Sequence, residues 1–82
     1  MMSLVEPEFI KGTARVLTMG AVKYEVDNWK KCEDRKRYKD ALLRHIYDYS
    51  SGNKTDDESG ESHLYHAACN LMFLDAFDKE GK

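Results

Sequence analysis

The sequence predicts a small all-α domain built from three main helices. Three segments of the 82-residue chain place apolar residues at helical spacing, and the strongest, residues 62–77, contains no Gly, Pro or β-branched residue. Residues 25–33 contain Asp27 and Asn28, which favour a turn, and residues 51–60 form a polar stretch with two glycines, as is typical of loops between helices. We treat residues 1–82 as one domain, because a chain of this length has room for one core only.

Composition indicates a globular protein and argues against several classes. Apolar residues make up 41% and charged residues 34% of the chain, unlike the balance of disordered segments. The net charge of −2 argues against a nucleic-acid partner, because such domains normally present a basic face. No stretch approaches the roughly 18 apolar residues of a membrane span, and no signal peptide is recognisable, so we expect no membrane association and a cytoplasmic location. Cys32 and Cys69 are expected to be free thiols.

The first helix is expected from about Glu8 to Tyr24. Apolar residues recur there at helical spacing, and Pro7 suits a first turn. Gly12 and Gly20 each weaken a helix interior by roughly 1 kcal/mol relative to alanine. Gly20 therefore indicates either close helix packing or a break in the helix, and both alternatives stay open.

The second helix is expected from about Asp34 to Ser50. Its inward face should consist of aromatic and aliphatic side chains at helical spacing, together with His45 or Ile46. Asp40 and Arg44 stand four residues apart, so we expect an ion pair between them at or near the surface.

The third helix, residues 62–77, is expected to be the central one. Ser62 can cap it, and apolar residues cover most of its circumference, so neighbours should cover most of its faces. One narrow polar stripe interrupts them, formed by His63, His66 and Asn70 at positions i, i+3 and i+7. Two other helices can barely cover the apolar surplus of this helix, so we expect a homodimer or higher homo-oligomer.

The loop before the third helix carries Asp56, Asp57 and Glu58, shortly before His63 and His66. Loop and helix could therefore converge on one divalent ion, and oxygen ligands suit Mg²⁺ or Mn²⁺. The alternative is that the histidines are structural, since the chain has no zinc-type His-Glu-x-x-His pattern. Residue types alone indicate a small all-α domain with a polar seam.

Five blocks of sequence in one order carry a more specific signal. They are Gly20-Ala-Val-Lys-Tyr24, Asn28-Trp-Lys30, Tyr38-Lys-Asp-Ala-Leu-Leu-Arg-His45, Asp57-Glu-Ser-Gly60, and His63-Leu-Tyr-His-Ala67 followed by Asn70. Over about residues 20–77 the chain resembles the phage and bacterial dATP/dGTP diphosphohydrolases. That family is similar in turn to the MazG-like all-α nucleoside triphosphate pyrophosphohydrolases. The wider group holds its metal with Glu-x-x-Glu on one helix and Glu-x-x-Asp on a later one. Where the later motif would lie, this chain has His63-x-x-His66 followed by Asn70, so the metal ligands of the group cannot be transferred.

The resemblance implies a metal-dependent enzyme that releases pyrophosphate from a purine deoxynucleotide, dATP or dGTP, with Mg²⁺ or Mn²⁺ as the cofactor. The candidate metal ligands are Asp40, Glu58, His63 and His66. The candidate catalytic residues are Asp40, His45 and Glu58. The candidates for substrate binding, which offer charge to the phosphates or a surface to the base, are Lys23, Asn28, Trp29, Lys30, Arg44 and Asn70. The alternative is a non-catalytic, phage-derived interaction module that retains the fold.

The polar stripe leads to a geometric expectation. Imidazoles and an amide on an apolar helix must find partners, because buried polar groups without hydrogen bonds are costly. We therefore expect His63, His66 and Asn70 to face a solvent-connected cleft that also includes Glu58 and the second helix near Asp40 or His45. In a nucleotide-binding protein, at least one polar edge of this stripe would stay open to water, metal or phosphate.

Overall fold

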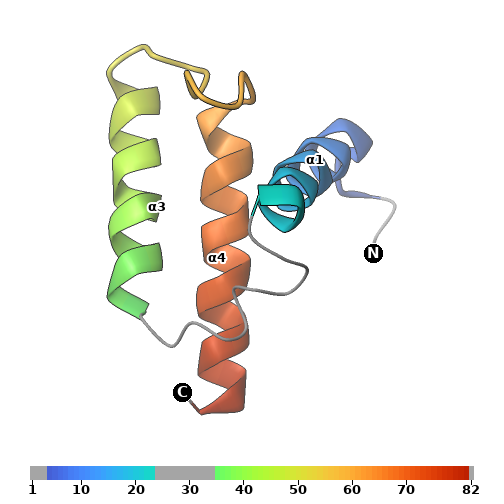
Figure 1. Ribbon diagram of the computed structural model, residues 1–82, viewed down its shortest axis with the longest axis vertical. Helices are drawn as coiled ribbons and strands as arrows, with labels where there is room; N and C mark the ends of the chain where they lie inside the picture. Colours follow the sequence, from blue (N-terminus) through green and yellow to red (C-terminus); the bar gives the residue numbers. More distant parts are fainter. Residues whose placement is uncertain (1–3, 24–34, 82) are drawn as a thin grey trace.

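The computed structural model describes residues 4–23 and 35–81, with the side chains of the first helix described as far as Gly20 (Figure 1). Within these residues the chain forms the helices α1 (Pro7–Lys23), α3 (Arg35–Ser50) and α4 (His63–Glu80). The prediction of an all-α domain with three main helices is confirmed. None of the helices in the described part of the chain has the length and apolar character that a membrane span requires.

Local sequence signals explain both ends of α4. At the N-terminus, the Ser62 hydroxyl accepts a hydrogen bond from the Leu64 amide at 3.1 Å, as the sequence predicts. At the C-terminus, Gly81 adopts a left-handed conformation and its amide donates to the Asp78 carbonyl. The helix runs three residues beyond its expected end, and an ion pair between Lys79 and Asp75 at 3.1 Å supports this last turn.

Helix α4 lies between the other two helices (Figure 1). Helix α3 runs antiparallel beside it, joined by the loop of residues 51–62, and α1 packs obliquely against the opposite side of its N-terminal half. The expected central position of this helix is therefore observed. Both neighbours meet α4 near its N-terminus, where the polar stripe begins.

The apolar core is small and sits mainly between α3 and α4. Phe77 is almost fully buried, and the Tyr38 ring packs against Phe77 and Phe73 with centroids 5.8 and 4.9 Å apart. Ala67 and Cys69 are also buried further up α4. Burial of a side chain as large as Phe contributes about 1.5–3 kcal/mol, so this aromatic cluster is a main source of stability.

Gly12, not Gly20, is the glycine that permits close helix packing. A Cβ atom at Gly12 would lie 2.2 Å from Cε2 of Tyr65, whereas a Cβ at Gly20 would meet nothing within 4 Å. Within the described residues nothing packs closely against Gly20, and helix α1 continues past it to Lys23. The break that Gly20 could mark was expected near residues 22–24, where α1 ends and the described part of the chain stops. Tyr65 also packs edge-on against Phe9, with ring centroids 5.8 Å apart.

The buried and exposed faces of α4 differ from those expected. The polar stripe turns inward, with His63 and Asn70 buried, while Leu71 remains 56% exposed and Leu64 and Met72 are partly exposed. Two neighbours within the chain therefore leave part of this apolar helix uncovered. The homodimer expected to cover it stays a prediction, because the structure contains one chain.

Candidate functional site

The loop between α3 and α4 is folded into a tight structure that presents Asp56 to α4. The Asp56 amide donates to the Glu61 carbonyl at 2.8 Å, and the Gly60 amide donates to the Asp56 carbonyl at 2.7 Å. Gly60 has a φ of 74°, a conformation that glycine adopts without the penalty of a Cβ atom. These bonds fix the path of the loop so that Asp56 and Ser59 point back toward the helix.

Two histidines from different helices meet beneath this loop. The Nδ1 atoms of His45 on α3 and His63 on α4 lie 2.8 Å apart, and their ring centroids are 5.1 Å apart. The side chains are only 5% and 3% exposed, respectively. Since a hydrogen bond between two such nitrogens needs one proton, one ring donates and the other accepts.

His66 joins the same cluster from the next turn of α4. Its ring stacks on that of His45, with centroids 4.7 Å apart and planes inclined by 13°. Its Nε2 lies 2.7 Å from the Ser59 hydroxyl and 3.8 Å from Oδ2 of Asp56. The Ser59 amide donates to this same Asp56 oxygen at 2.9 Å, so the loop and the imidazoles form one connected network.

Burial and charge set the protonation of the cluster. Burial lowers the pKa of His45 to about 4, and the positive charges of His66 and Arg44 act in the same direction. Burial likewise lowers the pKa of His66. For Asp56, burial opposes ionisation, but hydrogen bonds from Ser59 outweigh it and the pKa is lowered. Near neutral pH the imidazoles of His45 and His66 are therefore neutral and Asp56 is a carboxylate, the protonation states that metal ligands need.

One nitrogen in the cluster has no partner within the described part of the chain. Nε2 of His63 is buried and makes no hydrogen bond there. Leaving a buried polar atom unpaired costs about 1–3 kcal/mol, which a purely structural histidine would normally avoid. The orphaned nitrogen indicates that the cluster is built for more than packing.

The geometry of the cluster meets the first requirement of a metal site. His45, Asp56 and His63 each offer one ligand atom, and these three atoms all lie within 4.8 Å of one another. Two of the three donors are imidazole nitrogens. Mg²⁺, the ion implied by the family resemblance, prefers an all-oxygen shell, so this donor set does not fit it well.

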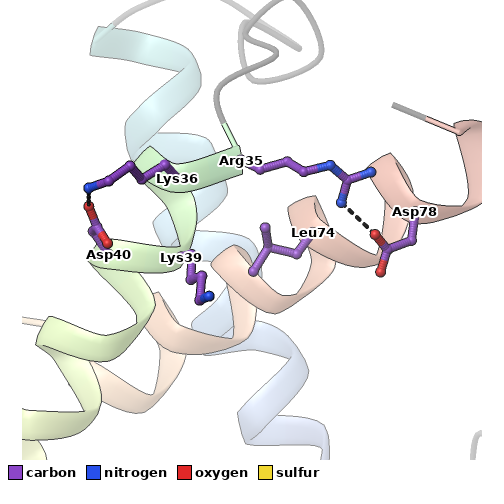
Figure 2. A pocket seen from close by; sticks show the side chains of 6 residues that line it. All are labelled: Arg35, Lys36, Lys39, Asp40, Leu74 and Asp78. Carbon is purple, nitrogen blue, oxygen red and sulfur yellow. Dashed lines mark hydrogen bonds and ion pairs between the residues drawn. The ribbon is translucent and has the colours of Figure 1, made fainter.

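Asp40 lies away from this cluster, contrary to its expected place beside His63 and His66. Its carboxylate pairs with Lys36 at 2.7 Å, so the expected pair with Arg44 is replaced by this one. Figure 2 shows Asp40 in a surface pocket lined also by Lys39, Leu74 and an Arg35–Asp78 ion pair. The physical reason is helical periodicity: five residues separate Asp40 from His45, which turns the two side chains about 140° apart around α3.

The other predicted residues of the described regions surround the cluster in different ways. Glu58 lies exposed on the loop, and Arg44 is exposed on α3 next to His45. Asn70 is buried, and its Nδ2 donates to the backbone carbonyl of His66 at 3.0 Å. The expected solvent-connected cleft is thus reduced to a largely buried cluster, in which the side chains of His66 and Asp56 keep 19% and 23% exposure.

Four predicted substrate-binding residues cannot be placed. Asn28, Trp29 and Lys30 lie outside the described residues, and Lys23 ends α1 without a described side chain. Their roles stay predictions.

Two residues of the cluster, Asp56 and Ser59, were missing from the predicted site. Asp56 stood in the acidic run of the loop, but sequence reasoning selected its neighbour Glu58. A usable signal was the spacing of three residues from Asp56 to Ser59, since Asp side chains commonly accept hydrogen bonds from nearby backbone amides. That signal favours a fixed carboxylate at Asp56.

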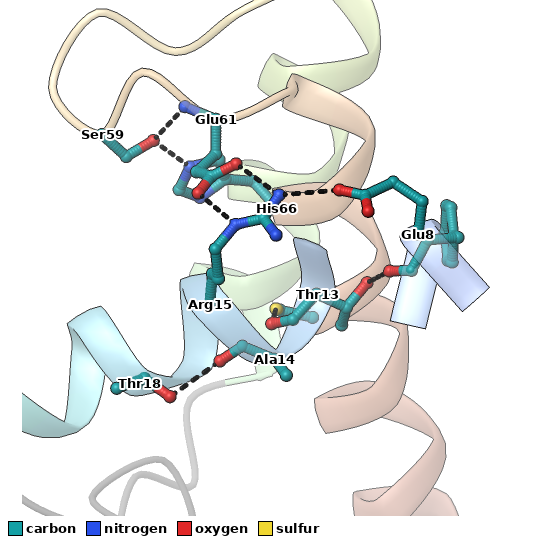
Figure 3. A network of polar contacts seen from close by, with 10 residues as sticks. Glu8, Thr13, Ala14, Arg15, Thr18, Ser59, Glu61 and His66 are labelled. Atoms are coloured by element: carbon teal, nitrogen blue, oxygen red, sulfur yellow. Dashed lines mark hydrogen bonds and ion pairs between the residues drawn. The ribbon is translucent and has the colours of Figure 1, made fainter. Parts of the chain in front are cut away.

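A second polar network joins the loop to α1 (Figure 3). Arg15 donates to both carboxylate oxygens of Glu61, at 2.7 and 3.1 Å, and also to Glu8 at 3.2 Å. Hydrogen bonding to Arg15 lowers the pKa of Glu61. The Glu61 amide in turn donates to the Ser59 hydroxyl at 3.2 Å, so α1 is connected to the histidine cluster through Ser59.

Comparison with known proteins shows which family the chain resembles. A family model described as dATP/dGTP diphosphohydrolase, N-terminal, matches residues 1–82. A protein of Salmonella phage PMBT28 named dATP/dGTP diphosphohydrolase is 41% identical over 73 residues, which cover 89% of this chain and 25% of that protein. This chain thus spans about a quarter of the length of that relative. No solved structure matches significantly.

The family match covers the whole chain, and it includes the loop and the α4 stretch that form the cluster. The resemblance noted in the five sequence blocks is thereby confirmed. On this evidence the chain belongs to the dATP/dGTP diphosphohydrolase family and corresponds to its N-terminal part.

Proposed function

We propose that this domain binds the triphosphate of a purine deoxynucleotide, dATP or dGTP, and takes part in its metal-dependent hydrolysis to the monophosphate and pyrophosphate. The observation that carries the proposal is the cluster of His45, Asp56, His63 and His66 beneath a fixed loop. The name of the phage relative supports the reaction and the substrate.

The chain's own residues offer groups for each part of this reaction. Water must attack a phosphorus atom and lose a proton, and a neutral imidazole or a carboxylate within hydrogen-bond reach can accept it. His66 and Asp56 suit this role because they keep partial exposure, whereas His45 and His63 are nearly sealed. Exposed Arg44 beside the cluster suits the phosphate charge.

In this proposal Mg²⁺ or Mn²⁺ accompanies the nucleotide. Either ion, when bound, would offset phosphate charge and polarise the bond that breaks. Phosphate oxygens and the exposed loop carboxylate Glu58 suit these ions better than the imidazole pair does. Asp40 stays a weaker candidate, because it lies around the helix beside Lys36.

Direct assay of the products tests the proposal. The 82-residue chain is incubated with each of the four deoxynucleoside triphosphates and either Mg²⁺ or Mn²⁺, and monophosphate and pyrophosphate are quantified by chromatography. We expect equimolar products from dATP or dGTP, with at least tenfold less product from Asp56→Asn and unchanged product from Asp57→Asn. Products absent from all four nucleotides would contradict the hydrolase proposal.

The substitution Arg44→Ala tests whether Arg44 binds a phosphate of the nucleotide or is only a surface charge. An exposed charge contributes about 0–1 kcal/mol to stability, so the melting temperature should change little. We expect the affinity for dATP or dGTP, measured by calorimetry, to fall at least tenfold, because the phosphate loses its cation. Equal affinity in the variant would remove Arg44 from the site.

A second candidate function is a non-catalytic binding or assembly module. It is favoured by exposed apolar side chains on the outer face of α3, where Leu43 is 57% and Tyr47 71% exposed. Homo-oligomerisation would cover such a face. Light scattering tests this, and we expect Tyr47→Lys to convert a dimer to a monomer while the helical circular dichroism is retained.

A further inference from the structure

The donor set beneath the loop differs in kind from the one that Mg²⁺ requires. Its three ligand atoms come from α3 (His45), the loop (Asp56) and the first turn of α4 (His63). Imidazole suits zinc and its neighbours in the first transition row, whereas Mg²⁺ takes oxygen ligands in a strict octahedron and retains several waters. Two imidazoles and one carboxylate are a common ligand set of catalytic Zn²⁺, which keeps a fourth position open.

The ligand atoms need to move only slightly to bind a metal ion. Two ligand atoms held by one tetrahedral Zn²⁺ at about 2.1 Å lie roughly 3.4 Å apart. The Nδ1 atoms of His45 and His63 are 2.8 Å apart, so binding through both of these nitrogens needs them to separate by roughly half an ångström. The three ligand atoms lie within 4.8 Å of one another, so Asp56 also needs only a small approach.

The hydrogen bonding of His63 independently indicates that an ion binds at this cluster. This side chain is 3% exposed, its Nδ1 shares a single proton with His45, and its Nε2 has no partner in the described part of the chain. Whichever tautomer is present, one polar nitrogen of the buried ring stays unsatisfied. A metal ion bound at Nε2 of His63 would give that nitrogen a partner, whereas an ion bound at Nδ1 would need the shared proton to move to Nε2 of the ring that carries it.

A second layer of contacts already orients two of the three ligands, Asp56 and His45. The Ser59 amide holds Oδ2 of Asp56 at 2.9 Å, and the Ser59 hydroxyl is held by Nε2 of His66 at 2.7 Å. The His66 ring also stacks on His45 and restricts its rotation. Outer contacts of this kind fix ligand orientation in metal sites, and their loss typically weakens metal binding about 10–100-fold.

We propose that His45, Asp56 and His63 bind one divalent transition-metal ion of the zinc type, and that Mg²⁺ does not occupy this position. His66 and Ser59 act as positioning residues for the ligands. A role of this ion in hydrolysis rests on the proposed function. The binding of the ion at these residues does not, and it can be tested without any nucleotide.

Binding of the metal alone tests the proposal. The tag-free chain is treated with chelator, desalted and titrated with Zn²⁺ by calorimetry and with Co²⁺ by visible absorption, which reports on ligand geometry. We expect one equivalent of each ion to bind and the melting temperature to rise, because an ion that binds only the folded state stabilises it. Mg²⁺ at millimolar concentration should give neither heat nor a melting shift.

Matched variants decide whether the ion sits at these residues. Asp56→Asn keeps the side-chain volume and should weaken Zn²⁺ binding at least tenfold, and His63→Gln should do the same with loss of the Co²⁺ spectrum. Asp57→Asn removes the neighbouring exposed carboxylate and should leave the affinity unchanged. If a His63 variant fails to fold, Asp56→Asn still decides the matter.

Two results would overturn the proposal: no stoichiometric Zn²⁺ or Co²⁺ binding to the native chain, or equal affinity in the native chain and Asp56→Asn. The outcome is separate from that of the hydrolase proposal. Pyrophosphate release with Mg²⁺ in a chain that binds no Zn²⁺ would refute only the metal site, and Zn²⁺ binding without any nucleotide hydrolysis would refute only the hydrolase.

Discussion

The two faces of α4 are held to their neighbours by different means. Toward α3 the contact is buried, with an aromatic cluster around Phe77 at one end and the histidine cluster at the other. Toward α1 the contact depends on close approach, where Tyr65 lies over Gly12, and on the Arg15–Glu61 ion pair near solvent. The comparison indicates that α3 and α4 form the stable pair and that α1 is the more weakly attached helix.

This difference matters for function because both contacts reach the same loop. The α3 side supplies His45 to the cluster, and the α1 side reaches Ser59 through Glu61. Exposed ion pairs contribute little to stability, whereas removal of a large buried side chain is costly. Changes on the α3 side should therefore affect the whole fold, and changes on the α1 side mainly the docking of one helix.

The largest effect is expected at Phe77. Phe77→Ala removes the almost fully buried ring that packs against Tyr38, and such substitutions typically cost about 3–5 kcal/mol. For a domain this small, that loss approaches the total stability. Denaturant unfolding followed by circular dichroism measures it. A loss below about 1 kcal/mol would show that the α3–α4 contact is not the main source of stability.

The next effect is expected at Gly12, on the α1 side. Gly12→Ala places a Cβ atom 2.2 Å from the Tyr65 ring, and overpacking of this kind costs typically about 1–3 kcal/mol, partly offset by a gain of about 1 kcal/mol in helix propensity. Thermal unfolding should show a net loss. Gly20→Ala is the matched control, and it should gain up to about 1 kcal/mol because nothing lies within 4 Å. Equal changes in stability at both glycines would show that the close approach of Tyr65 to Gly12 does not hold α1 against α4.

The histidine cluster should make stability depend on pH in the metal-free protein. The pKa of His45 is lowered to about 4 from its ordinary value of 6.5, mainly by burial, so between these values the unfolded chain binds a proton that the folded chain does not. The free energy of unfolding should therefore fall as the pH falls from about 6.5 to 4. Urea unfolding in chelator at pH 7, 6 and 5 measures this fall, and constant stability over that range would contradict the buried, neutral state of His45.

The smallest effect is expected at the Arg15–Glu61 pair. Glu61→Gln removes a charge near solvent, so a small loss of stability is expected at pH 7. The pKa of Glu61 is lowered by Arg15, so its contribution is present above the ordinary value of 4.5 and is lost as the pH falls through the folded value. The difference between native chain and variant should therefore shrink on acidification. A difference larger than that of Gly12→Ala would reverse the view of how α1 is attached.

Prediction from sequence succeeded for features with local causes. The three helices follow from apolar spacing, and the start of α4 follows from the Ser62 cap, whereas its end was expected at Phe77 and lies at Glu80. The polar stripe was located on the correct helix, with His45 as its neighbour on α3. Gly12 and Gly20 could not be told apart, because only the position of Tyr65 makes one of them necessary.

The sequence by itself determined the number and approximate extent of the helices and which residues of α4 carry polar groups, because capping and helical periodicity act within a few residues of the chain. Only the tertiary structure decided which carboxylate meets the histidines. That choice of Asp56 over Asp40 or Glu58 depends on the rotation of α3 against α4 and on the path of the loop through Gly60. Both are set by the packing of side chains distant in sequence, which no local pattern encodes.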